Sequence, residues 1–183
     1  MTESNDASIT LPSPSTAMDI LVGAIEQIKF ARDYTLQLLD STSLDDWFRI
    51  PDGLPTNIAW QVGHLTVSQY GLLMFRIRGR QPSDLELIPG KFRKAYGRGT
   101  TPSDDRSRQP TPDELLERFN RVFVDALGEL DSVDSDVLLE PCEMPYAGYP
   151  IKLGAIMFCP LHEHIHAGQI GLVRRSLGLD PVR

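Results

Sequence analysis

Residues 153–177, with the sequence LGAIMFCPLHEHIHAGQIGLVRRSL, carry the pattern that decides the fold. Apolar side chains recur there at intervals of three and four residues, which is the spacing of one face of an α-helix. Gly178 follows as a helix stop, and Arg174 and Arg175 lie near the C-terminus, where the helix dipole favours positive charge. We therefore predict one long helix over this stretch.

The same apolar spacing occurs in three other stretches and predicts helices over residues 15–41, 56–79 and 111–130. Helices of these lengths are about 30–40 Å long, which is typical of a bundle. No stretch shows the alternation with a period of two that predicts a β-strand. We therefore predict an all-α fold, a four-helix bundle with helices running up and down and with long crossover connectors over 81–110 and 131–152.

Helix ends are also visible in the sequence. Thr56 is the expected N-cap of the second helix and Gly79 its stop. The third helix begins at a capping box in which Thr111 pairs with Glu114, and Pro112 takes the first helical position. These signals set the predicted helix boundaries independently of the apolar pattern.

The length of 183 residues suits one domain with a sizeable core. We predict a flexible N-terminal tail over residues 1–14 and a single helical bundle domain over residues 15–183. The tail lacks the basic start and apolar stretch of a signal peptide, and no apolar run is long enough to span a membrane. Two cysteines do not make a disulfide framework, so a cytoplasmic protein without a membrane partner is expected.

The formal net charge of −7 argues against nucleic acid as a partner, because a surface that neutralises phosphates is usually basic. A local basic patch remains around Lys91, Arg93, Lys94 and Arg98.

Three of the four histidines provide a candidate metal site. His162 and His166 are one helical turn apart and therefore project from one face of their helix. His64 lies near the middle of the second helix, at a matching depth in the bundle. Neutral imidazole is a good ligand for zinc, nickel, copper or iron(II), and three ligands leave coordination positions open. The sequence therefore predicts a site formed by His64, His162 and His166.

His164 points away from this pair and shares its stripe with Leu161, Gly168 and Gly171, where small residues allow close approach of an internal helix or a second subunit. His162, Glu163 and His166 also match the His-Glu-x-x-His motif of zinc peptidases, in which the glutamate is the general base. The third ligand of those enzymes usually lies downstream, and here no histidine follows His166. We therefore do not favour a peptidase.

Several neighbours of the histidines have two interpretations each. Cys159 is either a fourth ligand or a small buried core residue, and Glu163 is either a base or a residue that orients another group. Gln169 can hydrogen-bond a ligand imidazole or a bound water, or simply cap the packed layer. Gln61 and Asn57 can line the mouth of the cavity, although a helix cap is the simpler role for Asn57. The connector tyrosines are either a lid over the site or ordinary packing residues: Tyr146 and Tyr149.

Two motifs resemble those of the DinB superfamily: Trp60-Gln61-Val62-Gly63-His64-Leu65, and the run from His162 to Ile170. The resemblance implies a four-helix bundle, often a homodimer, with a divalent metal held by three histidines. The chain departs from the family pattern at Ile165 and Ala167, where the family usually has a histidine and a basic residue.

Some members of that superfamily are transferases or isomerases that use a low-molecular-weight thiol. The resemblance therefore implies an enzyme that binds zinc or nickel and transfers a thiol to a small-molecule substrate. A metal-dependent hydrolase and a non-enzymatic metal-binding interaction module remain as alternatives. No catalytic residue can be assigned from the sequence.

Overall fold

The computed structural model describes residues 9–182, and four long helical segments dominate it. The segments are α1 (Pro14–Asp40), the continuous rod formed by α2 (Ile58–Tyr70), η2 (Gly71–Phe75) and α3 (Arg76–Arg78), then α6 (Pro112–Asp131) and α8 (Lys152–Ser176). The described residues contain no β-strand, only an isolated bridge between Pro141 and Ile151. The predicted all-α class is therefore confirmed.

The capping signals predicted from the sequence mark several of the helix ends. Thr111 and Glu114 form the expected capping box of α6, and Gly79 ends α3 with a φ of 77° that favours glycine. The predicted N-cap at Thr56 is wrong by one residue. Asn57 caps α2 instead, because its side chain accepts a hydrogen bond from the Trp60 backbone at 2.8 Å.

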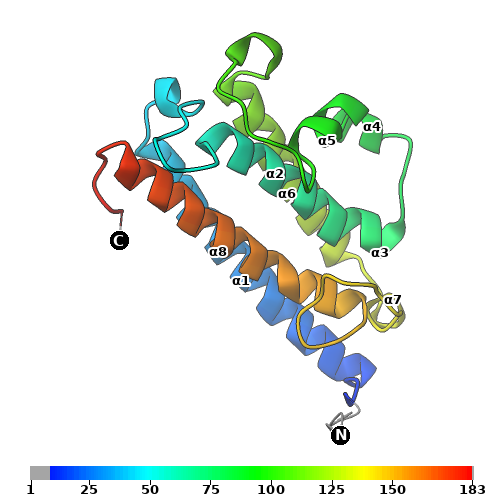
Figure 1. Cartoon of the computed structure of the whole chain (residues 1–183). Coiled ribbons are helices and arrows are strands. Elements are labelled where there is room, and N and C mark those ends of the chain that lie inside the picture. The colour runs from blue at the N-terminus through cyan, green and yellow to red at the C-terminus, as the bar shows by residue number, and fades with distance from the viewer. Residues whose placement is uncertain (1–8, 183) are drawn as a thin grey trace, which may run out of the picture.

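Contacts between the long helices define their relative directions (Figure 1). Helices α1 and α8 lie side by side and run the same way, since Arg32 pairs with Glu163 and Arg174 bonds to Leu38 further along both helices. The α2–α3 rod runs opposite to α8, because its C-terminal Ile77 contacts Lys152 at the start of α8.

At the ends of their helices, Arg78 of α3 pairs with Glu129 of α6, so α2 and α6 also share one direction. The order of directions is therefore up, down, down, up, which refines the predicted up-down arrangement. Residues 79–111 form the crossover connector that returns along the molecule.

The connectors contain the short helices. Residues 79–111 include α4 (Asp84–Leu87), α5 (Gly90–Tyr96) and η3 (Arg106–Arg108). Residues 132–151 include α7 (Ser135–Leu138), and η1 (Leu44–Asp46) follows α1. Helix α5 packs against α2, which brings the crossover connector to the side of the bundle where His64 lies.

The described residues share one contiguous hydrophobic core between the long helices. The predicted tail over residues 1–14 falls largely outside the described residues, although Ser13 and Pro14 already belong to the start of α1. No helix within residues 9–182 is long and apolar enough to cross a membrane.

Candidate metal centre

The three predicted histidines lie together between α2 and α8. One ring nitrogen from each of His64, His162 and His166 falls within 4.8 Å of the others. The Nε2 atoms of His162 and His166 are 3.2 Å apart, close to the separation of about 3.3 Å expected for two imidazoles on one tetrahedral metal. His64 and His166 are buried and His162 is half-buried. This arrangement can hold a metal ion.

Gln61 determines the orientation of His166. The His166 Nδ1–H donates to the Gln61 side-chain oxygen, which leaves Nε2 free to face His162. The Gln61 amide nitrogen donates to Gln169 Oε1 at 2.7 Å and to Thr56 Oγ1 at 2.8 Å, so the amide cannot turn without losing both bonds. Outer partners of this kind fix the tautomer and direction of a ligating imidazole.

The backbone of α5 orients His64 in the same way. The His64 Nδ1–H donates to the Tyr96 carbonyl at 2.8 Å, and the Trp60 indole stacks on the imidazole with 4.7 Å between ring centroids. Gly63 makes this approach possible, because a Cβ at that position would lie 2.3 Å from the Tyr96 ring. The Trp-Gln-Val-Gly-His segment of α2 therefore supplies both a ligand and the space that its partner needs.

Burial keeps the three imidazoles neutral. It lowers the pKa of His162 to about 4 and that of His166 to about 3, with smaller contributions from the neighbouring histidines. Burial also lowers the pKa of His64, although the hydrogen bond to Tyr96 acts in the opposite direction. A neutral imidazole is the form that ligates a metal, so the set is ready to bind at neutral pH.

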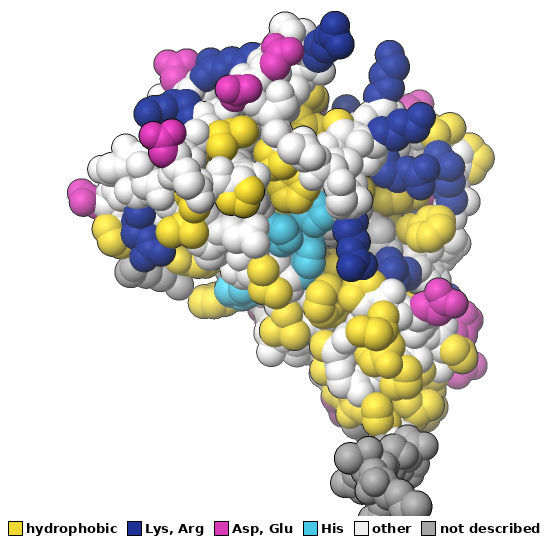
Figure 2. Space-filling model, viewed as in Figure 1, with side chains coloured by type: hydrophobic (Ala, Val, Ile, Leu, Met, Phe, Trp, Pro, Cys, Tyr) yellow, Lys and Arg dark blue, Asp and Glu magenta, His cyan; other side chains and the backbone are white. Residues whose placement is uncertain are grey.

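A cleft of about 690 Å³ opens onto the histidines. His64 and His162 line its wall, and apolar side chains of η2, α8 and the 132–151 connector line much of the remainder, among them Leu72, Phe158 and Met144. Figure 2 shows the histidines in this hollow, bordered by hydrophobic and by basic side chains. The site therefore has room for a small molecule next to the imidazoles.

Glu163 lies outside this site, contrary to the interpretations as a base or as a partner of His64. Its buried carboxylate accepts from Arg32 Nε at 2.9 Å. The Arg32 guanidinium also donates to Gln69 and to the Phe119 carbonyl. The Glu163 carboxylate is thus committed to a buried ion pair, which leaves the peptidase interpretation without its general base.

Cys159 is a core residue, which was one of its two interpretations. It is buried, and burial raises the pKa of its thiol. It is absent from the histidine cluster, and the charged groups that act on its thiol are Glu163 and Arg32. His164 is exposed and stacks on Phe30 of α1 at 5.9 Å between ring centroids. The predictions that excluded His164 from the site and preferred Cys159 in the core are in agreement with the structure.

The other predicted neighbours of the histidines have distinct roles. Gln169 acts on the ligands only through Gln61, and Asn57 caps α2 and donates to the Phe48 and Ser103 carbonyls. Tyr146 lines the cleft, whereas Tyr149 packs against the hydrophobic core.

Three polar residues of the cleft were not assigned to the site from the sequence: Ser68, Arg76 and Arg98. Ser68 is one turn after His64, with its hydroxyl 3.3 Å from His64 Nε2, so helical periodicity alone could have found it. Arg98 was assigned only to a basic patch, and no sequence pattern indicated a role for Arg76.

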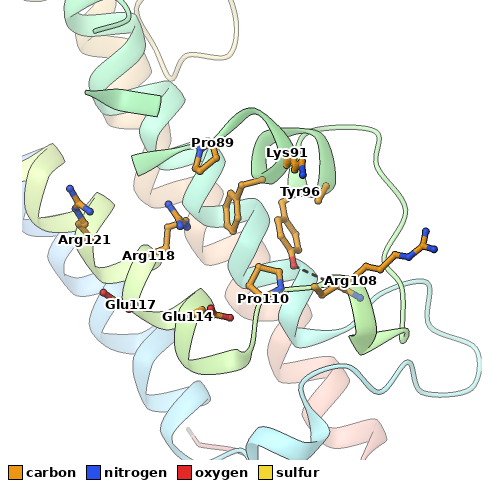
Figure 3. Close-up of a pocket in the computed structure, with 12 residues that line it drawn as sticks. Pro89, Lys91, Tyr96, Arg108, Pro110, Glu114, Glu117, Arg118 and Arg121 are labelled. Carbon is orange, nitrogen blue, oxygen red and sulfur yellow. Dashed lines mark hydrogen bonds between the residues drawn. The ribbon is translucent and has the colours of Figure 1, made fainter. Parts of the chain in front are cut away.

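A second cavity of about 590 Å³ lies behind Tyr96, between α5 and the start of α6 (Figure 3). Its charged residues have both signs, with Lys91 and Arg108 beside Glu114 and Glu117. Tyr96 contributes to both the second cavity and the histidine site. Its hydroxyl bonds to Gln109 at 3.3 Å beside the second cavity, and its carbonyl accepts from His64. Within residues 9–182 no histidine lines this second cavity, so the residues that could hold a metal belong to the first site.

The fold and the site define a class of protein: an all-helical protein with three neutral histidines gathered beside a cleft that two of them line. A family model described as the DinB superfamily matches residues 27–170, a range that contains all three histidines. The chain belongs to the DinB superfamily. Comparison with curated proteins found no match.

Proposed function

We propose that His64, His162 and His166 bind a divalent transition metal, zinc or nickel, and that the protein is a metal-dependent enzyme. The reaction we propose is transfer of a low-molecular-weight thiol to a small electrophile. The observation that carries the proposal is the direction of the imidazoles. His64 and His166 direct Nδ1 towards fixed acceptors, and one ring nitrogen from each of the three histidines lies within 4.8 Å of the others beside an open cleft.

A divalent metal held there would supply Lewis acidity, which lowers the pKa of a thiol or water in an open coordination position. The protein side chains provide the rest. Gln61 and the Tyr96 carbonyl hold two imidazoles in one tautomer, and Trp60 covers the face of His64. Phe158 and Leu72 keep part of the cleft apolar, which strengthens electrostatic interactions inside it.

A hydrolase at the same site is the second enzymatic candidate, since water could take the place of the thiol. Hydrolysis usually employs a general base next to the attacking water. No aspartate or glutamate occurs among the described residues that line the cleft. A free thiol has a pKa of about 8.5 and water one of about 15.7, so a metal-bound thiol depends less on such a base, which supports thiol transfer over hydrolysis. A cleft that ends at the histidines also supports an enzyme over a purely structural metal module.

We also propose a homodimer. Apolar side chains on neighbouring parts of α1 and α8 are exposed, among them Phe30 at 55%, Leu161 at 51% and Ile165 at 56%. Nothing lies within 4 Å of a Cβ built at Gly168 or Gly171, so no other part of the described chain covers this face. Sedimentation of the parent chain and of Ile165→Lys tests the proposal. A parent chain that sediments as a monomer, as Ile165→Lys does, would contradict the homodimer.

The metal site is tested by metal analysis of three purified proteins: the parent, His64→Ala and His164→Ala. His164 is the matched control because it is a histidine of α8 outside the cluster. We expect one divalent ion per chain in the parent and in His164→Ala, and a large loss in His64→Ala. Equal affinity in His64→Ala and the parent would show that His64 is not a ligand.

The reaction is tested by thiol consumption with a panel of small electrophiles, using the metal-loaded parent and His64→Ala. We expect turnover in the parent that disappears in the variant. Absence of turnover with every common low-molecular-weight thiol would contradict the transferase.

A further inference from the structure

We propose that the small molecule bound in the histidine cleft carries a carboxylate or similar anionic group, and that Arg98 and Arg76 bind this group. The proposal rests on the proposed function, because it names the substrate class of the same cleft. Both arginines line the cleft with His64 and His162. Arginine is the side chain best suited to a carboxylate, since its guanidinium forms two parallel hydrogen bonds to the two oxygens.

The π-helical segment η2 directs Arg76 towards the cleft. Arg76 follows His64 by twelve residues. In an uninterrupted α-helix with about 100° per residue it would point about 120° away from His64, because twelve residues exceed three full turns by that angle. The π-turn at Gly71–Phe75 takes about one residue more than an α-turn, which reduces this angle to about 20°. Arg76 therefore shares the face of His64, and π-turns inside α-helices are frequent at functional sites.

Arg76 retains donors for a ligand. Its guanidinium donates to the Gly71 carbonyl at 3.2 Å and to the Met144 carbonyl at 3.4 Å. A guanidinium has five N–H donors, so these two long bonds leave others free. The two bonds also hold the side chain between η2 and the 132–151 connector, at the edge of the cleft.

Arg98 is positioned by the segment that orients His64. It follows Tyr96 by two residues, and the Tyr96 carbonyl accepts from His64. Glycines flank it: a Cβ at Gly97 would lie 2.7 Å from the Arg93 carbonyl, and Gly99 has a φ of +83°. The backbone path therefore depends on both glycines. Arg98 has no ion-pair partner within residues 9–182, so its charge is available to a ligand.

The charge of the cleft opposes that of the whole chain. The protein has a formal net charge of −7, yet the described cleft residues include two arginines and no carboxylate. A neutral or cationic substrate would gain nothing from this arrangement, whereas an anionic one is attracted to it and held next to the histidines. Apolar residues line the space between, so the fitting ligand has a small apolar body and an anionic end.

The test compares two thiols of similar size, one anionic and one neutral: 3-mercaptopropionate and its methyl ester. Each is titrated into the cobalt(II)-loaded protein and followed through the absorption that arises when sulfur binds cobalt. We expect the parent to bind the carboxylate about tenfold more tightly than the ester, as a charge-assisted hydrogen bond would provide. Arg98→Gln and Arg76→Gln should each reduce this preference, and the matched control Arg93→Gln, on the same connector but outside the cleft, should retain it.

Equal binding of the two thiols by the parent, or an unchanged preference in both cleft variants, would overturn the proposal. Failure of the proposed function looks different, because then neither thiol produces the sulfur-to-cobalt absorption. In that case calorimetry with 3-phenylpropionate and 3-phenylpropanamide decides the arginine proposal alone. A preference for the carboxylate that Arg98→Gln removes would support it, and no preference would refute it.

Discussion

At the scale of single residues, Gln61 is the side chain on which the geometry of His166 depends. Its oxygen accepts from His166 Nδ1, and its nitrogen is held by Gln169 and Thr56. An amide is well suited to this position, because one end accepts while the other donates. Helical spacing places Gln61 on the same face of α2 as His64. Its hydrogen bond to His166 joins two helices, so the spacing within one helix does not predict it.

We predict that Gln61→Leu weakens metal binding about 10- to 100-fold, because His166 loses the acceptor that fixes its tautomer and direction. Competition with a chromophoric zinc chelator measures the change. Gln27→Leu is the matched control, since Gln27 is exposed on α1 and should leave the affinity unchanged. Parental affinity in Gln61→Leu would show that the amide does not orient the ligand.

At the scale of elements, the crossover connector is anchored by Asp84 at the start of α4. The Asp84 carboxylate accepts from both Arg78 Nη atoms at 2.9 and 3.1 Å, from the Gln81 backbone at 2.8 Å and from the Tyr70 hydroxyl at 2.8 Å. The Arg78 guanidinium, together with the other two donors, lowers the pKa of Asp84 to about 2. These bonds connect the end of the α2–α3 rod to the segment that leads to α5.

The lowered pKa predicts an acid dependence of stability. An unfolded aspartate has a pKa of about 3.9, so the ionised native form stabilises the fold above that pH, and the contribution disappears as pH falls towards 2. We expect Asp84→Asn to lower the free energy of unfolding by about 1–2 kcal/mol at pH 7, after allowance for solvent screening of the pair. The difference from the parent should shrink between about pH 4 and pH 2.

Urea unfolding at a series of pH values measures this difference. Asp19→Asn serves as the control, because Asp19 is exposed on α1. A deficit in Asp84→Asn that stays constant down to pH 2 would contradict the assignment.

At the scale of the whole molecule, one arginine joins all four long segments. Arg32 of α1 pairs with Glu163 of α8, donates to Gln69 of α2 and to the Phe119 carbonyl of α6, and lies 3.4 Å from the centroid of the Phe119 ring. The side chains of the Arg32–Glu163 pair are only 2% and 3% exposed. Glu163 lies about 100° around α8 from His162, so the ion-pair cluster and the candidate metal site use adjoining faces of one helix.

We predict that Glu163→Gln lowers the free energy of unfolding by about 3–5 kcal/mol, because it leaves the charge of Arg32 buried without a partner. Metal affinity should stay at the parental value, because Glu163 lies outside the histidine cluster. Urea unfolding and the chelator competition measure the two quantities.

The double variant Arg32→Met/Glu163→Leu provides the control for this prediction. It removes both charges, so much of the lost stability should return. A Glu163→Gln protein as stable as the parent would show that the ion pair contributes little.

Much of the helical scaffold could be predicted because its signals are local. Apolar spacing and the capping box around Thr111 involve neighbours within one or two turns, so the chain needs no tertiary partner to display them. The error at Thr56 has the same origin. Two adjacent residues can both cap a helix, and Asn57 is selected by its further bonds to Phe48 and Ser103 from other segments.

The sequence by itself determined the four helices and the three histidines, since helical periodicity alone places His162 and His166 on one face. Only the tertiary structure decided what each side chain meets, because those contacts depend on how helices pack and where connectors return. The crossover connector delivers the Tyr96 carbonyl to His64, packing of α1 against α8 gives Glu163 its partner, and a π-turn moves Arg76 to the cleft. Such contacts join residues far apart in the chain, and no local pattern encodes them.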